Sequence, residues 1–141
     1  MEKAPHFLKI TILILSALLV FLTGATTYAR DTLNPGETLR RGDNLTSSNG
    51  RYRLIMQHDG NLVLYGGRRD PLWATNTQGQ RVERCVMQSD GNLVLRDKNG
   101  KVVWAANTYG HPNATLLMGD DGNVVILDEK GVIFWSNGKP V

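Results

Sequence analysis

The feature that most constrains the fold of this chain is an internal repeat with a period of 31 residues. An Asp-Gly-Asn triplet recurs at this interval, beginning at Asp59, Asp90 and Asp121. Tryptophan recurs in the same phase, at Trp73, Trp104 and Trp135. A repeat of this length indicates one supersecondary unit used several times, in which neighbouring units bury each other's apolar faces. Residues 32–50 have no counterpart in the repeat, and we expect them to supply strands that complete one of three sheets.

Each repeat has the pattern of consecutive β-strands. Apolar runs flank an Asp-Gly pair in LIMQHDGNLVLY and in its two later copies, and this arrangement is a strong hairpin signal. In the first copy we expect a strand ending near Gln57, a turn at Asp59-Gly60 and a strand from Asn61 to Tyr65. A third strand carries the tryptophan in PLWATN, VVWAAN and VIFWSN. Nothing after residue 29 has sustained helical periodicity, so the domain is predicted to be all-β.

The alternation of side chains along a strand assigns residues to the core. Leu62 and Leu64 share the face expected to be buried, whereas Asn61, Val63 and Tyr65 share the opposite face. The tryptophans of the three repeats are expected to meet near a pseudo-three-fold axis and to close the core. The alternative is that each tryptophan forms a stacking platform for a sugar ring.

The first 29 residues are predicted to be a secretory signal peptide. A basic region precedes an almost wholly apolar stretch from Ile10 to Leu22, and small residues follow at Thr27 and Ala29, where signal peptidase reads the chain. The stretch is shorter than the roughly 20 residues of a membrane-spanning helix, so we favour cleavage over an uncleaved anchor. We expect secretion, with the vacuole as another destination, and no membrane insertion after cleavage. The predicted organisation is a signal peptide over 1–29 and one domain over 30–141.

Charge and cysteine content exclude several classes of function. The net charge is +3, and every arginine lies between Arg30 and Arg96, interrupted by acidic residues. No nucleic-acid motif accompanies this charge, so we expect a solvated surface and no nucleic-acid partner. Cys85 is the only cysteine, which excludes an intrachain disulfide and the common cysteine-based zinc sites. It aligns with Leu54 and Leu116 of the other repeats, so we expect it to be buried.

Five polar and apolar residues of the first repeat form the pattern Q-x-D-x-N-x-V-x-Y, namely Gln57, Asp59, Asn61, Val63 and Tyr65. This pattern resembles the sugar-binding motif of the bulb-type (monocot mannose-binding) lectins, and it recurs in phase with a W-x-x-N sequence. The resemblance extends over about residues 33–138 and identifies 30–141 as a bulb-type lectin domain. It implies a β-prism of three antiparallel sheets with pseudo-three-fold symmetry and a shallow mannose site on each sheet.

These five residues suit the recognition of D-mannose without a metal or cofactor. Mannose is distinguished by its axial 2-hydroxyl, to which Asp59 offers an acceptor and Asn61 both a donor and an acceptor. The resemblance implies that Gln57 contacts the 3-hydroxyl and Tyr65 the 4-hydroxyl, with Val63 against the ring carbons. The alternative for Asp59 and Asn61 is an ordinary role in the turn, which does not explain Gln57 and Tyr65. We predict a lectin that binds D-mannose or mannose-rich glycans, mainly through the first repeat.

The other two copies of the motif have changed. The second copy keeps four of its residues, Gln88, Asp90, Asn92 and Val94. Arg96 replaces the tyrosine there and cannot accept a hydrogen bond, so we expect a weaker site or one suited to an acidic sugar. The third copy keeps only Asp121, Asn123 and Val125. Because Gly119 and Leu127 replace its glutamine and tyrosine, we expect this copy to be inactive toward mannose.

Two other classes of function compete with this interpretation. An enzyme is not expected, because none of the three histidines accompanies a serine, Cys85 or a pair of carboxylates in a catalytic pattern. A lectin-fold protein that acts through protein–protein contacts is the stronger alternative, since two of the three motifs have changed. The intact first motif favours sugar binding.

The resemblance has further implications for assembly and modification. It implies a homodimer that exchanges the C-terminal strand, here Val132 to Asn137, whose apolar residues would otherwise leave an exposed sheet edge. Asn44-Leu45-Thr46 and Asn113-Ala114-Thr115 match the signal for N-glycosylation, so the protein is a candidate glycoprotein. Defence against organisms that display mannose is a role implied by the family alone.

Overall fold

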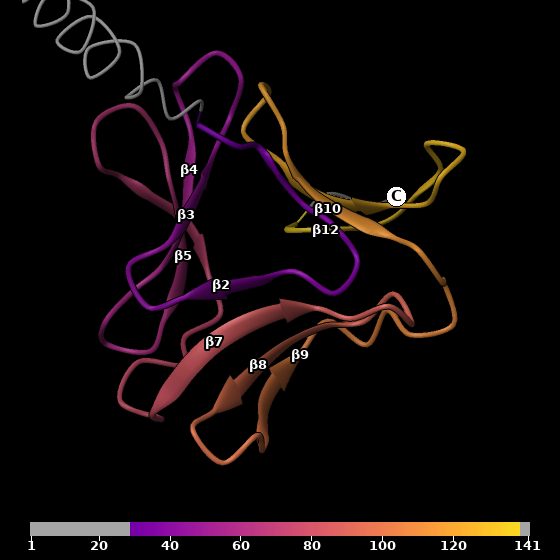
Figure 1. The fold of residues 1–141 in the computed structure, drawn as a ribbon. Helices are drawn as coiled ribbons and strands as arrows, with labels where there is room; N and C mark the ends of the chain where they lie inside the picture. Colours follow the sequence, from indigo (N-terminus) through magenta and orange to yellow (C-terminus); the bar gives the residue numbers. More distant parts are fainter. Residues whose placement is uncertain (1–28, 139–141) are drawn as a thin grey trace, which may run out of the picture.

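Twelve short β-strands form three four-stranded sheets in the computed structural model, which describes residues 29–138 (Figure 1). Sheet I consists of β3 (Asn44–Thr46), β4 (Arg53–Met56), β5 (Leu62–Tyr65) and β6 (Pro71–Ala74). Sheet II consists of β2 (Thr38–Arg40), β7 (Val82–Met87), β8 (Leu93–Asp97) and β9 (Val102–Ala105). Sheet III consists of β1 (Thr32–Leu33), β10 (Thr115–Met118), β11 (Val124–Leu127) and β12 (Ile133–Ser136). All the pairings are antiparallel, which confirms the predicted β-prism.

The predicted signal peptide over residues 1–29 lies outside the described residues, apart from Ala29, and stays a prediction. Between residues 29 and 138, no helix has the length and apolar character needed to cross a membrane.

The Asp-Gly turns form the hairpins that the sequence predicts. β4 ends at Met56 and β5 begins at Leu62, within one residue of the expected bounds. In each repeat the aspartate Oδ1 accepts a hydrogen bond from the backbone N–H two residues later, at 2.9–3.0 Å. The intervening glycine has a positive φ, which is +91° at Gly91, where a Cβ would lie 2.2 Å from the carbonyl oxygen of His111. Backbone conformation and space therefore both require glycine in this turn.

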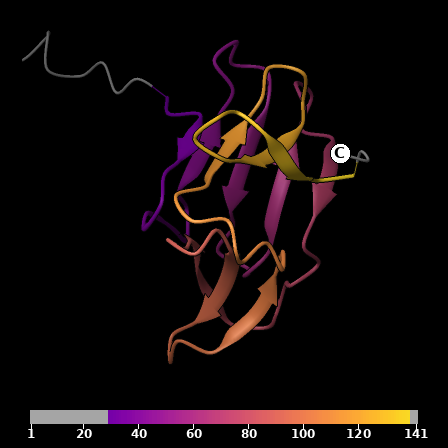
Figure 2. The ribbon, with the colours of Figure 1, turned by 90° about the vertical axis from the view of Figure 1, so that its right-hand side faces the viewer.

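The N-terminal segment completes all three sheets, so the expectation that it completes only one is wrong. β1 pairs with β10 in sheet III, β2 with β7 in sheet II and β3 with β4 in sheet I. Turns at Gly36 and Gly42, with φ of +84° and +91°, redirect the chain after each short strand. The backbone N–H of each glycine donates to the end of a neighbouring strand, at 2.7 Å. The segment thus passes along all three sheets (Figures 1 and 2).

Apolar side chains from all three sheets fill the space between them. The predicted core residues Leu62 and Leu64 are fully buried, as are leucines of β1, β2 and β3. The tryptophans of β6, β9 and β12 pack edge-to-face around the axis, with ring centroids 5.9–6.5 Å apart and interplanar angles of 74–77°. This geometry places the edge of one ring against the face of the next, a favourable arrangement for aromatic pairs. The core role predicted for the tryptophans is confirmed.

Hydrogen bonds also fix the segments between the sheets. The Gly79 N–H, in the segment that joins sheet I to sheet II, donates to the carbonyl oxygen of Asp59, at 2.9 Å. The motif turn of sheet III contacts the β3–β4 loop of sheet I. There the Asn49 backbone N–H donates to Asp120 Oδ1 at 2.9 Å, and Asn49 Nδ2 donates to the Asp120 carbonyl oxygen at 3.0 Å. Sheet III is therefore joined directly to sheet I through this loop.

Cys85 is a buried thiol, as the sequence predicts. It lies in β7 between Leu39 of β2 and Leu95 of β8, and none of its surface is exposed. Burial raises the pKa of the thiol from 9.0 to about 12, because the core disfavours the thiolate. The residue is therefore a neutral packing group in the folded protein.

The raised pKa of Cys85 predicts a pH dependence of stability. The unfolded chain ionises this thiol above pH 9.0 and the folded chain only near pH 12, so its contribution is complete below pH 9.0 and is lost between these values. Between pH 8 and 10, wild type should lose about 1 kcal/mol more stability than Cys85→Ala, which has no thiol to ionise. Urea unfolding of both proteins at the two pH values measures this. Equal losses would contradict the predicted burial effect.

Candidate functional site

The first motif lies on the outer face of sheet I, where β4 and β5 form a hairpin. Gln57 directly follows β4, and Tyr65 is the last residue of β5. Ile55 pairs with Val63 and Arg53 with Tyr65, and residues directly opposite in an antiparallel pair share a face. The hairpin thus brings both ends of the motif to one surface.

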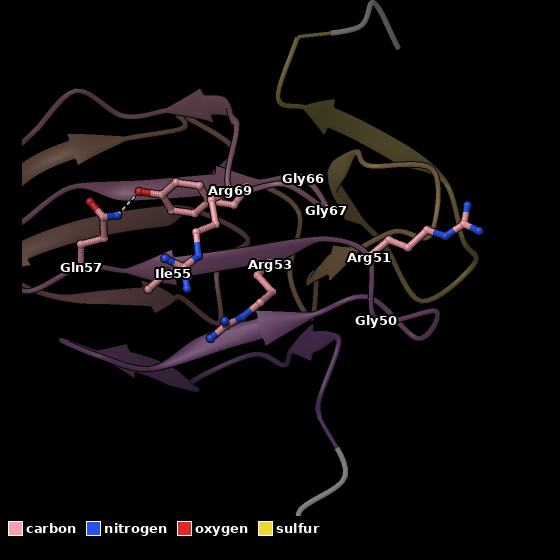
Figure 3. A pocket seen from close by; sticks show the side chains of 9 residues that line it. Gly50, Arg51, Arg53, Ile55, Gln57, Gly66, Gly67 and Arg69 are labelled. Carbon is pink, nitrogen blue, oxygen red and sulfur yellow. Dashed lines mark hydrogen bonds between the residues drawn. The ribbon is translucent and has the colours of Figure 1, made fainter.

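Three of the predicted site residues are linked by hydrogen bonds. The side-chain amide of Gln57 contacts the Tyr65 hydroxyl (Figure 3). The amide orientation that satisfies both of its ends has the oxygen accepting from Tyr65 and the nitrogen donating to the Asp59 carboxylate, 3.2 Å from Oδ1. Gln57 is therefore fixed between an acceptor and a donor, and the polar atoms of all three residues converge on one patch of surface.

Asn61 has a structural role in addition to its predicted one. Its Oδ1 accepts hydrogen bonds from the Thr75 hydroxyl at 3.1 Å and from the Thr77 backbone N–H at 3.3 Å. The buried Thr77 hydroxyl in turn donates to the carbonyl oxygen of Gly60, at 2.7 Å. Asn61 thus ties the motif turn to the segment after β6, and its amide N–H groups are left as donors to a ligand.

Val63, the fourth motif residue, is more deeply buried than its strand alternation suggests. Val63 is on the outer face, but only 3% of its surface is exposed. Its cross-strand neighbour Ile55 is half-buried and lines the surface beside Gln57 and Tyr65. Ile55 therefore offers more apolar surface to a sugar ring than Val63 does.

A shallow hollow of about 460 Å³ extends from Gln57 and Tyr65 toward two loops. Its remaining lining includes Arg51 and Arg53 from the β3–β4 hairpin and Arg69 from the β5–β6 loop. Sequence reasoning missed these arginines. Only Arg53 had a usable signal, since the predicted hairpin places it opposite Tyr65, whereas the other two reach the hollow through loops.

The second motif on sheet II repeats this arrangement with Arg96 in place of tyrosine. The Gln88 amide, oriented as in the first motif, accepts from Arg96 Nη2 at 2.6 Å and donates to Asp90 Oδ1 at 3.2 Å. Arg96 Nη1 also donates to the carbonyl oxygen of Gly100, at 2.6 Å. Two donors of Arg96 are thus already engaged. Val94 is 1% exposed, and Asn92 Oδ1 accepts from the Thr108 N–H at 3.1 Å.

The surface next to the second motif is strongly basic. A separate open hollow of about 590 Å³ lies on sheet II. Its lining residues are Thr38, Arg40, Arg41, Glu83, Arg84 and Lys98. Arg41 is partly neutralised, because its Nη2 lies 3.6 Å from Glu83 Oε1.

The third motif on sheet III keeps the backbone of the turn but has different side-chain contacts. Asp121 occupies the space that the missing glutamine would fill, so that a Cβ at Gly119 would lie 2.7 Å from Asp121 Oδ1. Asn123 Nδ2 donates to Asp121 Oδ2 at 2.8 Å, a contact that the other two motifs lack. Leu127 offers no polar group where the first motif has the Tyr65 hydroxyl.

Other candidate groups lie apart from these motifs. No cluster of three or more His, Cys, Asp or Glu side chains suited to a metal occurs among residues 29–138. Of the two glycosylation signals, Asn113 is exposed in the turn before β10. Asn44 is half-buried in β3, where its Oδ1 accepts from the Thr46 hydroxyl at 2.9 Å.

Lectins of solved structure resemble this chain over most of its length. A monomeric monocot mannose-binding lectin from Gastrodia elata is 39% identical, with a TM-score of 0.71 and coverage of 79% of this chain and 99% of that one. The mannose-specific agglutinin of snowdrop (Galanthus nivalis) bulbs, solved with methyl α-D-mannoside, is 41% identical, with a TM-score of 0.64 and coverage of 79% and 98%.

Matches to curated proteins are shorter. A mannose-specific lectin of Narcissus pseudonarcissus is 52% identical over 52 residues, which are 37% of this chain and 39% of that lectin. For the first three curated relatives, the match spans 40%, 39% and 31% of the relative's length. No protein-family model matches the chain.

Three antiparallel sheets around one axis, each with a copy of the motif on its outer face, define a β-prism lectin. Given its identity to the solved lectins over nearly their full length, the chain belongs to the bulb-type (monocot mannose-binding) lectin family. Its relatives are lectins, in agreement with the expectation that it is not an enzyme.

The contacts of the motif asparagines predict unequal effects on stability. Asn61→Ala and Asn92→Ala each leave a backbone N–H without its acceptor, which should lower the free energy of unfolding by about 1–3 kcal/mol. Asn123→Ala removes a contact to a side chain in an exposed turn and should cost less. Urea unfolding of the three variants measures the difference. Three equal losses would show that the contacts to Thr77 and Thr108 stabilise the fold no more than the Asn123 contact does.

Proposed function

We propose that this protein is a carbohydrate-binding lectin that recognises D-mannose or mannose-rich glycans without a metal, mainly through sheet I. The observation that carries the proposal is the linked set of Gln57, Asp59 and Tyr65 beside the amide of Asn61. A neutral sugar needs several donors and acceptors fixed in one place, because each hydroxyl that leaves water must find a partner. The family membership supports the same conclusion, since several relatives are named mannose-specific lectins.

The hydrogen bonds within the motif give each residue a role in this proposal. Asp59 Oδ1 accepts from the Asn61 backbone N–H, and Oδ2, which lies 3.3 Å from the Gln57 amide nitrogen, has a further lone pair for the axial 2-hydroxyl. The Asn61 amide N–H donates to the same hydroxyl. Gln57 contacts the 3-hydroxyl and Tyr65 the 4-hydroxyl, and Ile55 lies beneath the ring, with Val63 behind it. Discrimination against glucose follows, because its equatorial 2-hydroxyl points away from Asp59.

The three motifs differ in what they offer a sugar. On sheet II the Arg96 guanidinium donates to Gln88 and Gly100 and cannot accept, so this copy is the weaker site. On sheet III the glutamine and tyrosine groups are missing, and Asp121 has moved into the space of the former. One effective site per chain is therefore expected.

Removing the Tyr65 hydroxyl tests the proposed site. Tyr65→Phe keeps the ring but leaves a sugar hydroxyl unpaired, so binding of methyl α-D-mannoside should weaken by about 1–3 kcal/mol in calorimetry. Tyr109→Phe is the matched control, because Tyr109 is 67% exposed and outside the motif, and it should bind like wild type. Wild type should prefer the mannoside to methyl α-D-glucoside and should be insensitive to EDTA.

The outcomes separate the two functions considered. Identical isotherms for wild type and Tyr65→Phe would contradict the proposed mannose site on sheet I. A wild-type protein that binds no mannoside, and no glycan on an array, would favour the alternative of a lectin fold that acts through protein–protein contacts.

We also propose secretion and dimerisation by exchange of the C-terminal strand. A single shallow sugar site has an affinity near the millimolar level, about −4 kcal/mol, so useful binding to a glycan surface needs several sites. In the single chain, β12 pairs with β11 of the same chain, and Trp135 packs on Trp73 and Trp104. Exchange would make the same contacts between two chains and would bring two sheet I sites into one particle.

A designed disulfide tests the exchange. Val125 and Ser136 are directly opposite in β11 and β12, so the double variant Val125→Cys, Ser136→Cys places two thiols within bonding range. If the strands are exchanged, oxidation should link the two chains, and a non-reducing gel should show a dimer. A disulfide-linked monomer would contradict the exchange. Wild type, whose Cys85 is buried, should form neither product.

A further inference from the structure

Three arginine side chains lie beside the first motif and line the hollow. Arg51, Arg53 and Arg69 line it with Gln57 and Tyr65, and no carboxylate lines it. All three arginines are exposed, and within residues 29–138 their guanidinium groups form no ion pair or hydrogen bond. In Figure 3 the side chains of Arg53 and Arg69 extend toward the Gln57 end of the hollow, whereas Arg51 points away from it. Two unpaired cationic groups therefore flank the proposed sugar site.

The backbone conformation of Arg69 is unfavourable for any residue other than glycine. Arg69 has φ of +61°, in the left-handed region that favours glycine. The corresponding residues of the other two repeats are Gly100 and Gly131, with φ of +83° and +80°. The turn is fixed by the Arg69 N–H, which donates to the Gly66 carbonyl oxygen at 3.2 Å. Arg69 thus holds a conformation that glycine would adopt more easily, and it lines the hollow beside the motif.

We propose that this site prefers mannose-containing glycans that carry an anionic substituent, a phosphate, sulfate or carboxylate, near the 6-position of the bound mannose. This inference rests on the proposed mannose binding. With the 4-hydroxyl at Tyr65, the neighbouring C5 places its C6 group at the Tyr65 end of the site, on the side of Arg53 and Arg69. Guanidinium groups bind tetrahedral and planar oxyanions through paired N–H donors.

Four small probes separate the parts of this proposal. Calorimetry compares methyl α-D-mannoside, its 6-phosphate, methyl α-D-glucoside 6-phosphate and inorganic phosphate. The mannoside 6-phosphate should bind about five-fold more tightly than the neutral mannoside at low salt, and the advantage should shrink at high salt because exposed charges are screened. The glucoside 6-phosphate differs only at C2 and should bind more weakly than its mannose counterpart.

Three variants assign the preference to this hollow. Arg53→Gln and Arg69→Gly should each lower the ratio of phosphorylated to neutral mannoside affinity by two-fold or more. Arg69→Gly should also melt at the same temperature as wild type or higher, since it relieves the positive φ, and this separates lost binding from lost folding. Arg84→Gln is the matched control, because Arg84 occupies the position of Arg53 in the second repeat, and it should keep the wild-type ratio.

Several results would overturn the inference. If the neutral mannoside binds and its 6-phosphate binds no more tightly, the proposed anion-binding subsite is contradicted. The proposed mannose binding then still holds. If no mannoside binds, both fail. A preference that is abolished by Arg84→Gln, or an equal affinity for the glucoside 6-phosphate or for inorganic phosphate, would place anion binding outside the mannose site.

Discussion

The whole structure depends on the fact that none of its three sheets can bury an apolar face alone. Each sheet has short strands and one apolar side, and only the other two sheets can cover that side. The edge-to-face packing of Trp73, Trp104 and Trp135 is the point where all three meet. Because each ring contacts both of the others, the positions of the sheets are coupled. The outer faces, which carry the motifs, are thereby fixed by a core that they do not touch.

The sequence predicts most of the fold because repetition strengthens weak signals. One hairpin of four-residue strands is an uncertain prediction, but three in the same phase, with a tryptophan in each, leave few alternatives. The N-terminal segment lacks this support. Its strands are two or three residues long, too short for alternation to show, and their partners are chosen by turns at Gly36 and Gly42. Its distribution over three sheets was therefore beyond sequence reasoning.

The residues of the candidate site could be predicted from the sequence. The burial of each residue and the loops that extend the site could not. Alternation assigned Val63 to the outer face correctly, but Val63 is almost fully buried there, and the half-buried Ile55 lines the hollow instead. Asn61 was predicted as a sugar ligand, whereas its bonds to Thr75 and Thr77 come from the segment that follows β6. The arginines could not be predicted from the motif, because Arg51 and Arg69 lie outside its residue pattern. Both reach the hollow only through loops.

The path of the N-terminal segment has a consequence for the order in which the protein assembles. Sheet I needs only residues up to Ala74, sheet II residues up to Ala105, and sheet III residues up to Ser136. β1, the first of the strands described between residues 29 and 138, thus waits for β10 and belongs to the sheet whose strands are synthesised last. Pairings of such long sequence separation slow folding, because the loop must close before the contacts form. During synthesis the strands of the three sheets become available in the order I, II, III, and β1 pairs in the sheet that becomes available last.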